Sequence, residues 1–524
     1  MHSPRPRSLP PVALASLVAQ LGASVVGGAS AAGVLVTGVS LDSRTVRPGD
    51  LYAALPGAHA HGATFAAQAV AAGAAAVLTD PDGAARLADD LAVAVLSVPD
   101  PRAVLGAVAA VVYGHPADAL RMVGVTGTNG KTTTAYLLES ALRGLGARTG
   151  LIGTVETRIG DERVASQRTT PEAPDLHAIL AVMREAGTDS VVMEVSSHAL
   201  AQHRVDGVVY DIALFTNLSQ DHLDYHAGMG DYFEAKAQLF TPARAHRGVV
   251  CVDDDWGVAL AARDGIPLVT LSSRRSADWT LNTDDAPSLT LLGPGGERLV
   301  LPCHLPGTFN LVNTAMAAVA LLQLGYAAPD VERAMAREPV VPGRMERVQG
   351  GPEDPRCVVD YAHTPEAVDA ALAALRPSTP GRLVVVLGAG GDRDTLKRSA
   401  MGAAGARWAD DLIVTDDNPR SEDPATIREQ VLAGARVVAP PGTEETPQAR
   451  ARSLFSSDAG RAAHIARAVA LARAQGRAAD NTVVVLGKGH ETGQDIGGIV
   501  HPFDDRDALA AALRGQPYRP EAEA

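Results

Sequence analysis

The sequence predicts an α/β protein built from three modules. Short apolar runs recur between helical stretches, and turn-forming residues separate them, which is typical of buried strands in mostly parallel sheets. A chain of 524 residues is also long enough for about three domains that each bury a core. We expect a disordered tail at residues 1–20 and modules at 21–115, 116–340 and 341–524.

The composition excludes several classes of partner. With 46 basic and 60 acidic residues, the net charge of −14 opposes binding to nucleic acid or to an anionic membrane surface. The three cysteines lie far apart and form no CxxC pair, so neither a zinc site nor a disulfide framework is indicated. No apolar run reaches membrane-spanning length, and the basic start lacks a signal-like apolar core. We expect a cytoplasmic monomer that is not inserted in a membrane.

The first module is predicted to be a small α/β domain. Its candidate strands are the apolar runs at 34–39, 51–55 and 74–78, and Ala-rich helical stretches lie between them.

The second module begins with the strongest motif of the chain. An apolar run at 122–125 is followed by a glycine-rich loop and then by an amphipathic run at 135–145. Converging backbone N–H groups can hold phosphate oxygens, Lys131 can reach the outer phosphates, and the Thr132 hydroxyl can ligate Mg²⁺. The loop consists of Gly127, Thr128, Asn129, Gly130, Lys131, Thr132 and Thr133.

This loop departs from the usual G-x-x-x-x-G-K-[ST] spacing, because Val125 stands where the first glycine would be. A glycine-rich turn that merely joins a strand to a helix is the alternative. The lysine and threonines at the start of a helical run favour a site for a nucleoside triphosphate.

Further strands are expected at 191–195, 212–216, 249–252 and 268–271. Glu194 interrupts the first of these apolar runs, and a buried carboxylate is costly unless a positive charge balances it. A Mg²⁺ ion would supply that charge; alternatively, Glu194 ends the strand and faces water. Ser196 follows at the strand end, which we expect to face the phosphate loop.

Two histidines and two aspartates crowd the segment after the next strand. Asp221, His222, Asp224 and His226 suggest metal and phosphate handling, although each histidine alone would more often be a surface or packing residue. Lys236 follows on a predicted helix at 232–236, where a lone lysine is usually solvated.

The third module is predicted to resemble a dinucleotide-binding fold without its fingerprint. Candidate strands lie at 357–359, 383–387, 412–415 and 483–486. The glycines that follow the second of these do not complete a G-x-G-x-x-G motif, because Arg393 occupies the last glycine position. Residues 437–460 are rich in Pro, Glu, Thr and Ser, and we expect a mobile surface loop there.

Taken in order, these motifs resemble the Mur ligase family over roughly residues 35 to 510. The resemblance rests on the phosphate loop, on Glu194 with Ser196, Ser197 and His198, on Thr216 to His226, on Gly307, Thr308, Phe309 and Asn310, and on Tyr361, Ala362 and His363. It implies a small UDP-binding α/β domain, a central P-loop ATPase domain with a mostly parallel sheet, and a C-terminal Rossmann-like domain. Its members are ATP-dependent ligases, and this one resembles those that add meso-diaminopimelate to UDP-N-acetylmuramoyl-dipeptide in peptidoglycan synthesis.

The resemblance also implies roles for individual residues. Lys131, Glu194, His222 and Lys236 would be catalytic, and Thr132, Glu194, His222 and a carbamylated Lys236 would hold two Mg²⁺ ions. ATP would be bound by the loop together with Asn310, Arg344, Asp360 and His363. The UDP end would contact Leu41 and Ser43, and the muramoyl-dipeptide would contact Thr169, Thr170, Ser196, Gln202 and Arg204. The incoming amino acid would contact Arg393, Asp417, Asn418, Pro419, Arg420, Gly487 and Glu491.

One of these residues has a clear physical reason for selecting diaminopimelate. This amino acid carries one carboxylate more than lysine, and the Arg420 guanidinium can grip a carboxylate in a bidentate fork. An Asp-Asn-Pro sequence is also an ordinary turn former, so the motif alone is weak. The alternatives are a lysine-adding sibling, a folate polyglutamylating ligase and a nucleotide-dependent regulatory or binding module.

The implied chemistry activates the glutamyl γ-carboxylate as an acyl phosphate, which the incoming amine then displaces. Positioning and charge neutralisation would supply most of the acceleration. Two segments depart from the family pattern: Arg168 stands before Thr169 where relatives often have Asn, and the stretch from Gly460 to His464 is a weakened version of a family segment.

Overall fold

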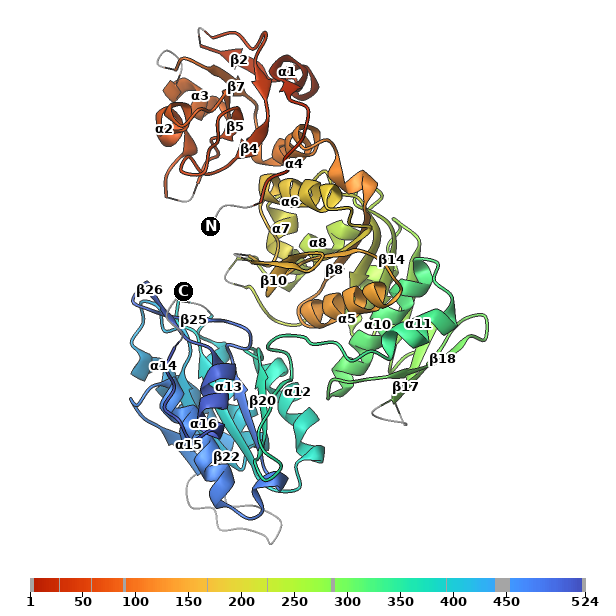
Figure 1. Cartoon of the computed structure of the whole chain (residues 1–524), viewed down its shortest axis with the longest axis vertical. Helices are drawn as coiled ribbons and strands as arrows, with labels where there is room; N and C mark the ends of the chain where they lie inside the picture. The colour runs from red at the N-terminus through yellow and green to blue at the C-terminus, as the bar shows by residue number, and fades with distance from the viewer. Residues whose placement is uncertain are drawn as a thin grey trace.

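The computed structural model of the chain describes residues 4–27, 29–57, 59–87, 91–166, 168–223, 225–283, 288–392, 394–438 and 453–520. Its large sheets each carry helices on their faces, and they follow one another along the long axis of the molecule (Figure 1). The predicted α/β class is confirmed. Within the described residues, no helix is long and apolar enough to cross a membrane.

The first domain contains a small sheet with strand order β2-β7-β6-β5-β4. β4 to β7 run parallel, β2 is antiparallel to β7, and the runs expected as strands at 34–39, 51–55 and 74–78 do form strands. Helix α4 begins after Asp100, whose carboxylate accepts from the N–H groups of Arg102 and Ala103 (3.0 and 3.1 Å). The elements are β1 (Val12–Ala13), α1 (Leu14–Leu21), β2 (Ser24–Val26), β3 (Leu35–Val36), β4 (Gly38–Ser40), β5 (Asp50–Ala53), α2 (Ala66–Ala71), β6 (Ala76–Thr79), α3 (Pro81–Leu87), β7 (Ala94–Ser97) and α4 (Pro101–Val112).

The expectation of a disordered tail at residues 1–20 is wrong for the segment that carries β1 and α1. β1 pairs with β3, and Leu14 of α1 is buried in the core of the first domain. An amphipathic segment that buries apolar side chains in this way gains enough contact to fold. The residues before it are also bound, since the backbone N–H of Arg7 donates to the Glu185 carboxylate (2.9 Å).

The middle domain contains a long sheet with strand order β11-β10-β9-β12-β8-β13-β14-β15-β16-β17-β18. The strands from β9 to β16 in this order are parallel, and antiparallel hairpins complete both edges. The strands expected in this region are confirmed as β8, β12, β13, β14 and β15. The edge hairpins were not predicted, because exposed polar residues interrupt their apolar pattern.

The middle domain begins at β8 (Arg121–Thr126) and ends with α11 (Ala328–Met335). Between them lie α5 (Lys131–Gly144), β9 (Thr149–Ile152), β10 (Glu156–Ile159), β11 (Glu162–Ala165), α6 (Ala173–Glu185), β12 (Ser190–Glu194), α7 (Ser197–Ala201), β13 (Tyr210–Phe215), α8 (Met229–Ala237), β14 (Ala245–Cys251), α9 (Asp255–Ala261), β15 (Leu268–Ser272), β16 (Trp279–Asn282), β17 (Ser288–Leu292), β18 (Arg298–Pro302) and α10 (Thr308–Gln323).

Helices cover both faces of this middle sheet. α5, α10 and α11 pack on one face, and α6, α7 and α8 pack on the other. Neighbouring residues of β8 alternate between the two cores, with Val123 and Val125 in one and Met122 in the other. A strand buried on both sides explains the continuous apolar run that precedes the glycine-rich loop.

The C-terminal domain contains a sheet with strand order β19-β20-β24-β21-β22-β23, parallel except for β19. All of the strands expected here are confirmed. The loop expected at 437–460 is wrong for Ser453–Ser456, which pairs with β22 as β23, and for 437–438, which end α14; residues 439–452 lie outside the described residues. The elements are β19 (Glu346–Val348), β20 (Arg356–Asp360), α12 (Pro365–Leu375), β21 (Leu383–Ala389), α13 (Lys397–Trp408), β22 (Asp411–Asp416), α14 (Pro424–Val438), β23 (Ser453–Ser456), α15 (Arg461–Ala474), β24 (Thr482–Leu486), β25 (Gly493–Ile496), β26 (Ile499–Pro502) and α16 (Asp505–Leu513).

The parallel strands place the predicted site residues at two sheet edges. β8, β12 and β13 are neighbours, so the loops at their carboxyl ends meet at one edge of the middle sheet. In the C-terminal sheet the same holds for β20, β24, β21 and β22. Ligands of open α/β sheets bind at such edges.

Candidate active site

The glycine-rich loop lies between β8 and α5 and has the backbone shape that its glycines allow. Gly127 and Gly130 have φ values of 146° and 88°, in the region that other residues rarely adopt. A Cβ on Gly127 would lie 1.9 Å from Thr216 Oγ1, and one on Gly130 would lie 2.5 Å from Asn313 Oδ1. Helix α5 starts directly after this turn, so its first N–H groups face the loop.

Lys131 is folded back over this loop. Its ammonium donates to the carbonyl oxygens of Gly127 and Thr128, both at 2.9 Å. Burial lowers the pKa of Lys131, against the raising effect of nearby Glu194. The ammonium is therefore held above the turn that is expected to take phosphate.

The Thr-Asn pair after β13 shapes the loop from the side. Thr128 N–H donates to Asn217 O (2.9 Å), and Asn129 N–H donates to Asn217 Oδ1 (2.9 Å). Thr216 Oγ1 donates in turn to Asn129 O (2.6 Å). These two residues begin the segment from Thr216 to His226 that carries the family resemblance, and the structure gives them a supporting position behind the loop.

Glu194 ends β12 as a buried carboxylate, with 1% of its surface exposed. It accepts from Thr132 Oγ1 (3.0 Å) and from the Oγ1 and backbone N–H of Thr154 (3.0 and 2.8 Å). The alternative that Glu194 faces water is therefore wrong. Hard oxygen atoms gather here beside the first turn of α5.

Thr154 is a residue of this site that sequence reasoning missed. It follows β9, a short strand that contains a glycine and that was not among the predicted strands. Thr154 Oγ1 is also 3.0 Å from Thr169 Oγ1. Through Thr154, the loop expected to contact the muramoyl-dipeptide reaches the buried carboxylate of Glu194.

Arg344 of the C-terminal domain reaches this edge. Arg344 Nη2 donates to Thr132 Oγ1 (3.2 Å), and its guanidinium lies 4.4 Å from the centre of the Tyr361 ring. Asp360 is buried and accepts from the N–H groups of Met345 (2.7 Å) and Ala362 (2.8 Å), which fixes the turns on either side of Arg344 and Tyr361.

The other two residues expected at the nucleotide are less direct. Asn310 is buried at the start of α10, where Nδ2 donates to Pro306 O (2.7 Å) and Oδ1 accepts from Asn313 (3.1 Å). Asn313 in turn accepts from Thr134 in the first turns of α5 (3.3 Å). The His363 ring lies against Tyr361, and burial lowers the pKa of its imidazole.

The residues expected to contact the muramoyl-dipeptide are linked around the end of β12. Thr170 Oγ1 donates to Glu194 O (2.9 Å) and accepts from the Ser196 N–H (3.1 Å). Arg204 donates to Gln202 Oε1 (2.6 Å) and forms an ion pair with Glu172 (3.0 Å). All of the predicted dipeptide contacts are therefore brought together beside the phosphate loop.

The first domain holds the residues expected at the UDP end. Ser43 Oγ lies 3.1 Å from Gln68 Oε1, and Leu41 is half-buried against the core of that domain. Their contacts in the described chain stay within this domain, and they are not joined to the phosphate loop.

The residues expected at the incoming amino acid lie on two loops of the C-terminal sheet. One loop follows β22 and the other follows β24, and Asn418 Nδ2 donates to Glu491 Oε2 across them (2.8 Å). Gly487 N–H donates to Asp360 O (3.2 Å). A Cβ on Gly391 would lie 1.9 Å from Pro419 O. The loop after β21 therefore packs tightly against the loop after β22 at this edge of the sheet. Arg393 lies outside the described residues.

Arg420 has an unusual backbone. Its φ of 52° lies in the left-handed region, which costs free energy for a side chain of this size. The conformation is held because Arg420 N–H donates to Asp495 O (3.0 Å) and its carbonyl accepts from the Gly497 N–H (2.7 Å). The guanidinium donates to Gly391 O, so it is held over the loop that follows β21.

Comparison with known proteins now decides the family. Residues 35–113 match the Mur ligase family catalytic domain, residues 125–321 the Mur ligase middle domain, and residues 343–489 the Mur ligase glutamate ligase domain. The UDP-N-acetylmuramoyl-L-alanyl-D-glutamate–2,6-diaminopimelate ligase of Streptomyces coelicolor is 52% identical over 517 residues, which cover 98% of each chain. The chain belongs to the Mur ligase family.

Two further relatives of this Mur ligase extend the match. A UDP-N-acetylmuramyl-tripeptide synthetase of Leifsonia xyli is 46% identical over 98% of this chain and 99% of its own. A solved structure of a UDP-N-acetylmuramoyl-L-alanyl-D-glutamate–2,6-diaminopimelate ligase aligns with a TM-score of 0.65 and 30% identity, over 93% of this chain and 96% of that chain. The predicted family and its ligase activity are confirmed.

The histidine cluster of this Mur ligase contains two different kinds of residue. His226 is buried and lies 3.0 Å from Ser197 Oγ and 3.1 Å from Asp231, so it packs the loop against α7 and α8. His222 is partly exposed, and its ring meets that of His198 edge-on at 4.8 Å. Burial lowers the pKa of His222 to about 4, which leaves a neutral imidazole. Asp224 lies outside the described residues.

Lys236 is the most unusual of the predicted catalytic residues. It lies on α8 with 1% of its surface exposed, and its Nζ donates to Gly127 O in the phosphate loop (2.9 Å). The Nζ also lies 4.5 Å from the centre of the Tyr232 ring. Burial, aided by Lys131, lowers the pKa of Lys236 well below its usual value. The reading of a solvated helical lysine is wrong.

The segment from Gly460 to His464, which departs from the family pattern, is nevertheless part of the scaffold of the amino-acid loops. Arg461 is fully buried and donates to Asp416 O (3.0 Å) and Leu486 O (2.9 Å), the last residues of β22 and β24. Arg168 forms an exposed pair with Glu172 (2.9 Å), the residue that also pairs with Arg204.

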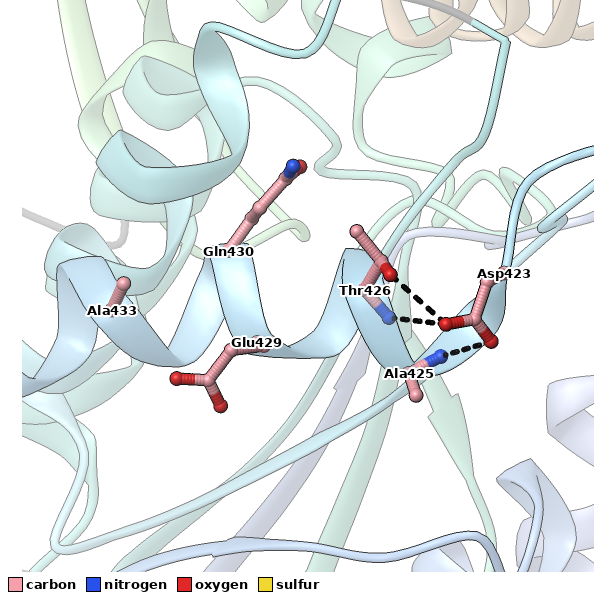
Figure 2. A pocket seen from close by; sticks show the side chains of 6 residues that line it. All are labelled: Asp423, Ala425, Thr426, Glu429, Gln430 and Ala433. Carbon is pink, nitrogen blue, oxygen red and sulfur yellow. Dashed lines mark hydrogen bonds between the residues drawn. The ribbon is translucent and has the colours of Figure 1, made fainter.

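A surface hollow elsewhere in the C-terminal domain is unrelated to these residues. It lies along the start of α14, where the Asp423 carboxylate accepts from Ala425 and Thr426, and none of the predicted site residues lines it (Figure 2).

Proposed function

We infer that this Mur ligase joins meso-diaminopimelate to UDP-N-acetylmuramoyl-L-alanyl-D-glutamate, with ATP as the energy source. The full-length similarity to the curated Streptomyces coelicolor ligase, at 52% identity, carries the assignment. The site supports it, because the sheet edge that would hold a nucleotide meets the domain that would hold an amino acid through the Arg344–Thr132 contact. We further propose that the enzyme is cytoplasmic and acts as a monomer.

The reaction forms an amide from a carboxylate and an ammonium. These two groups do not react with each other at neutral pH, so the carboxylate must first be activated. The glutamyl γ-carboxylate would attack the γ-phosphate of ATP to give an acyl phosphate with ADP as the leaving group, and the amine would displace phosphate through a tetrahedral intermediate. Lys131 and Arg344 would then hold the phosphate oxygens and offset the charge that develops on them. The ammonium would first lose a proton to give the nucleophilic amine, and the amine nitrogen would lose a second proton as the amide forms; placement of the reacting groups and neutralisation of charge would supply most of the acceleration.

The residues near Thr132 fit Mg²⁺. Thr132 Oγ1 and Glu194 Oε2 are hard oxygen ligands 3.0 Å apart, and the buried carboxylate accepts its hydrogen bonds from neutral groups. Mg²⁺ suits such a site, because it needs one or two protein oxygens and takes its other ligands from phosphate and water. In the described residues, no group of three or more His, Cys, Asp and Glu side chains forms a metal cage by itself. When bound, Mg²⁺ would neutralise charge on the transferring phosphate.

Lys236 would carry a carbamate, as the family resemblance implies. A carbamate forms when a neutral amine attacks CO₂ and releases a proton, and burial beside Lys131 favours the neutral amine. The product would be an anion attached at Nζ, which now lies 2.9 Å from Gly127 O, the same carbonyl oxygen that accepts from Lys131. Together with the neutral imidazole of His222, it could orient a second Mg²⁺.

Arg420 would select the amino acid. Its main chain is held by hydrogen bonds on both sides and its guanidinium donates to Gly391 O, so the side chain is preorganised to bind the distal carboxylate that lysine lacks. Asp417 and Glu491 would take the adjacent ammonium. The name of the Leifsonia relative leaves its amino acid open, so lysine is the competing substrate to test.

An amino-acid panel in a phosphate-release assay tests the assignment. Purified protein is incubated with UDP-N-acetylmuramoyl-dipeptide, ATP and Mg²⁺, together with meso-diaminopimelate, lysine or no amino acid. We expect phosphate release and a tripeptide product, detected by mass spectrometry, with diaminopimelate alone. Equal turnover with lysine would contradict the specificity, and ATP consumption without a tripeptide would contradict the ligase activity on this substrate.

A further inference from the structure

A buried lysine lies beneath the amino-acid loops, and the sequence analysis did not single it out. Lys488 follows β24, and its side chain has no exposed surface. Its Nζ lies 3.0 Å from Asn418 Oδ1, 3.0 Å from Glu491 Oε2 and 3.9 Å from Asp417 Oδ1. One ammonium therefore joins the loop after β22 to the loop after β24.

The arrangement has an electrostatic consequence for the two acids. Asp417 and Glu491 both lie within about 4 Å of the same nitrogen, so they are close to each other. Two carboxylates that share a partly buried site repel each other, and a cation between them offsets that repulsion. Lys488 supplies that counter-ion from below, where solvent cannot screen it.

The other charged groups around this site are engaged differently. Arg461 acts on both acids from beneath, but its guanidinium forms a paired contact with Asp505 (2.7 Å for both hydrogen bonds). Arg420 donates to the loop after β21. Burial lowers the pKa of His490 to about 3, and burial also keeps Tyr361 protonated by raising its pKa, so both of these neighbours are neutral.

We propose that Lys488 is a positioning residue of the amino-acid pocket, whose ammonium offsets the repulsion between Asp417 and Glu491 and holds Asn418 against Glu491. In this way the pocket presents two carboxylates to the ammonium at the distal end of the incoming amino acid. The inference rests on the proposed function, since it concerns how that substrate is captured.

Replacement of Lys488 with methionine keeps most of the side-chain volume but removes the charge. The repulsion between Asp417 and Glu491 then loses its nearest counter-ion and keeps only Arg461, which is already paired with Asp505, so in this variant we expect the two acids to take up a proton more readily. As the pH falls, one acid becomes protonated and the pocket loses attraction for an ammonium. The KM for diaminopimelate should therefore rise at every pH, and most at low pH.

The experiment measures KM for each substrate in wild type, Lys488→Met and Lys488→Arg between about pH 6 and pH 8, where the substrate ammonium groups stay protonated. In Lys488→Met we expect the KM for diaminopimelate to rise at least about tenfold at pH 8 and at least about threefold further at pH 6. The KM for ATP and for the UDP-dipeptide should stay within about twofold of wild type. Lys488→Arg should retain a flat pH profile, because the charge is kept.

A double variant separates this role from a packing role and guards against a misfolded single variant. Glu491→Gln removes one of the two acids, so the Lys488→Met, Glu491→Gln protein has no uncompensated pair and should lose the pH dependence of KM. A KM for diaminopimelate that is independent of pH in Lys488→Met, or a pH dependence that persists in the double variant, would overturn the proposal. Turnover of diaminopimelate by wild type in the same assay tests the proposed function separately.

Discussion

Arg344 of the C-terminal domain donates to the hydroxyl of Thr132 in the phosphate loop, at 3.2 Å. That hydroxyl donates in turn to the buried carboxylate of Glu194 (3.0 Å). One polar chain thus crosses from the domain expected to bind the amino acid to the domain expected to bind ATP. A guanidinium in this position can donate hydrogen bonds to the γ-phosphate of a bound nucleotide.

Replacement of Arg344 with alanine should lower kcat by about 10²-fold, the effect of removing one electrostatic contact from the transition state. Lysine at this position should restore only part of the rate, because it keeps the charge but loses the planar contact with Tyr361. Steady-state phosphate release measures both variants. A wild-type kcat in Arg344→Ala would show that the contact plays no part in turnover.

Replacement of Lys236 with alanine should abolish most activity, by about 10²-fold or more, because the charge that would face the second metal is lost. Small carboxylates such as acetate or propionate should restore part of the rate by filling the space with an anion. Lys236→Arg is the matched control: it keeps a cation that cannot be carbamylated, and acetate should not rescue it. Carbon-13 NMR of wild type under ¹³CO₂ should show a carbamate signal that is absent in both variants, and wild-type activity in Lys236→Ala would reject the requirement.

Replacement of Arg420 with alanine should raise the KM for diaminopimelate by about 10²-fold, since a charge-assisted bidentate contact is lost. The KM for ATP should not change. Arg436 on α14 is a suitable control, because it is an exposed arginine paired with Glu429, and Arg436→Ala should behave like wild type. Kinetics of Arg420→Ala with an unchanged preference for diaminopimelate over lysine would remove Arg420 from the specificity site.

The pH dependence of stability can be tested at His177, away from the predicted site residues. This histidine is fully buried on α6, its Nε2 lies 3.0 Å from Asp206 O, and burial lowers its pKa to about 4. The unfolded chain, with an ordinary histidine pKa of about 6.5, binds the proton more readily. The neutral form therefore favours the fold above about pH 6.5, and that advantage is lost as the pH falls from there toward 4.

His177→Gln should remove this term while keeping a hydrogen-bond donor for Asp206 O. Between about pH 7 and pH 4 the wild-type free energy of unfolding should fall by up to about 3 kcal/mol more than that of the variant. Urea unfolding at a series of pH values measures the difference. If the free energy of unfolding depended on pH in the same way for both proteins, the pKa of His177 would not differ between the folded and unfolded states.

The sequence was most informative where a residue with a chemical role lies at the end of a strand or just after it. Lys131, Glu194 and Asn418 all stand at or just beyond the end of an apolar run, and parallel pairing brings such ends to one edge. Thr154 was missed because β9 is short and contains a glycine, so no apolar run marks it. Lys488 was missed because a single lysine carries no pattern, and its burial depends on contacts with residue 418, which is 70 positions away in the chain.

Tertiary contacts also explain the expectations that were wrong. The basic, Pro-rich start was read as disordered, yet residues beyond it pair with β3 and bury Leu14. Lys236 on a short helix was read as solvated when taken alone, and it is buried because α8 packs against the phosphate loop. Composition and periodicity describe neighbours in the chain, whereas these outcomes depend on distant segments.

The buried pair of Arg461 and Asp505 offers a last test, of the scaffold beneath the amino-acid loops. Both side chains are fully buried, two hydrogen bonds of 2.7 Å join them, and Arg461 also donates to the last carbonyl groups of β22 and β24. A Cβ on Gly388 at the end of β21 would lie 3.0 Å from the Arg461 guanidinium, so the glycine makes room for it. Asp505→Asn leaves the guanidinium buried without its counter-charge and should lower the free energy of unfolding by about 3 to 5 kcal/mol.

The double variant Arg461→Met, Asp505→Leu removes both charges and should recover much of that loss, since an apolar pair of similar volume is often no less stable. It should nevertheless raise the KM for diaminopimelate more than the KM for ATP, because the carbonyl groups that precede Asp417 and Gly487 lose their shared donor. Urea unfolding and the KM values of the two variants measure these effects together. A double variant that is stable and has wild-type KM values would show that Arg461 supports the fold without placing the two loops.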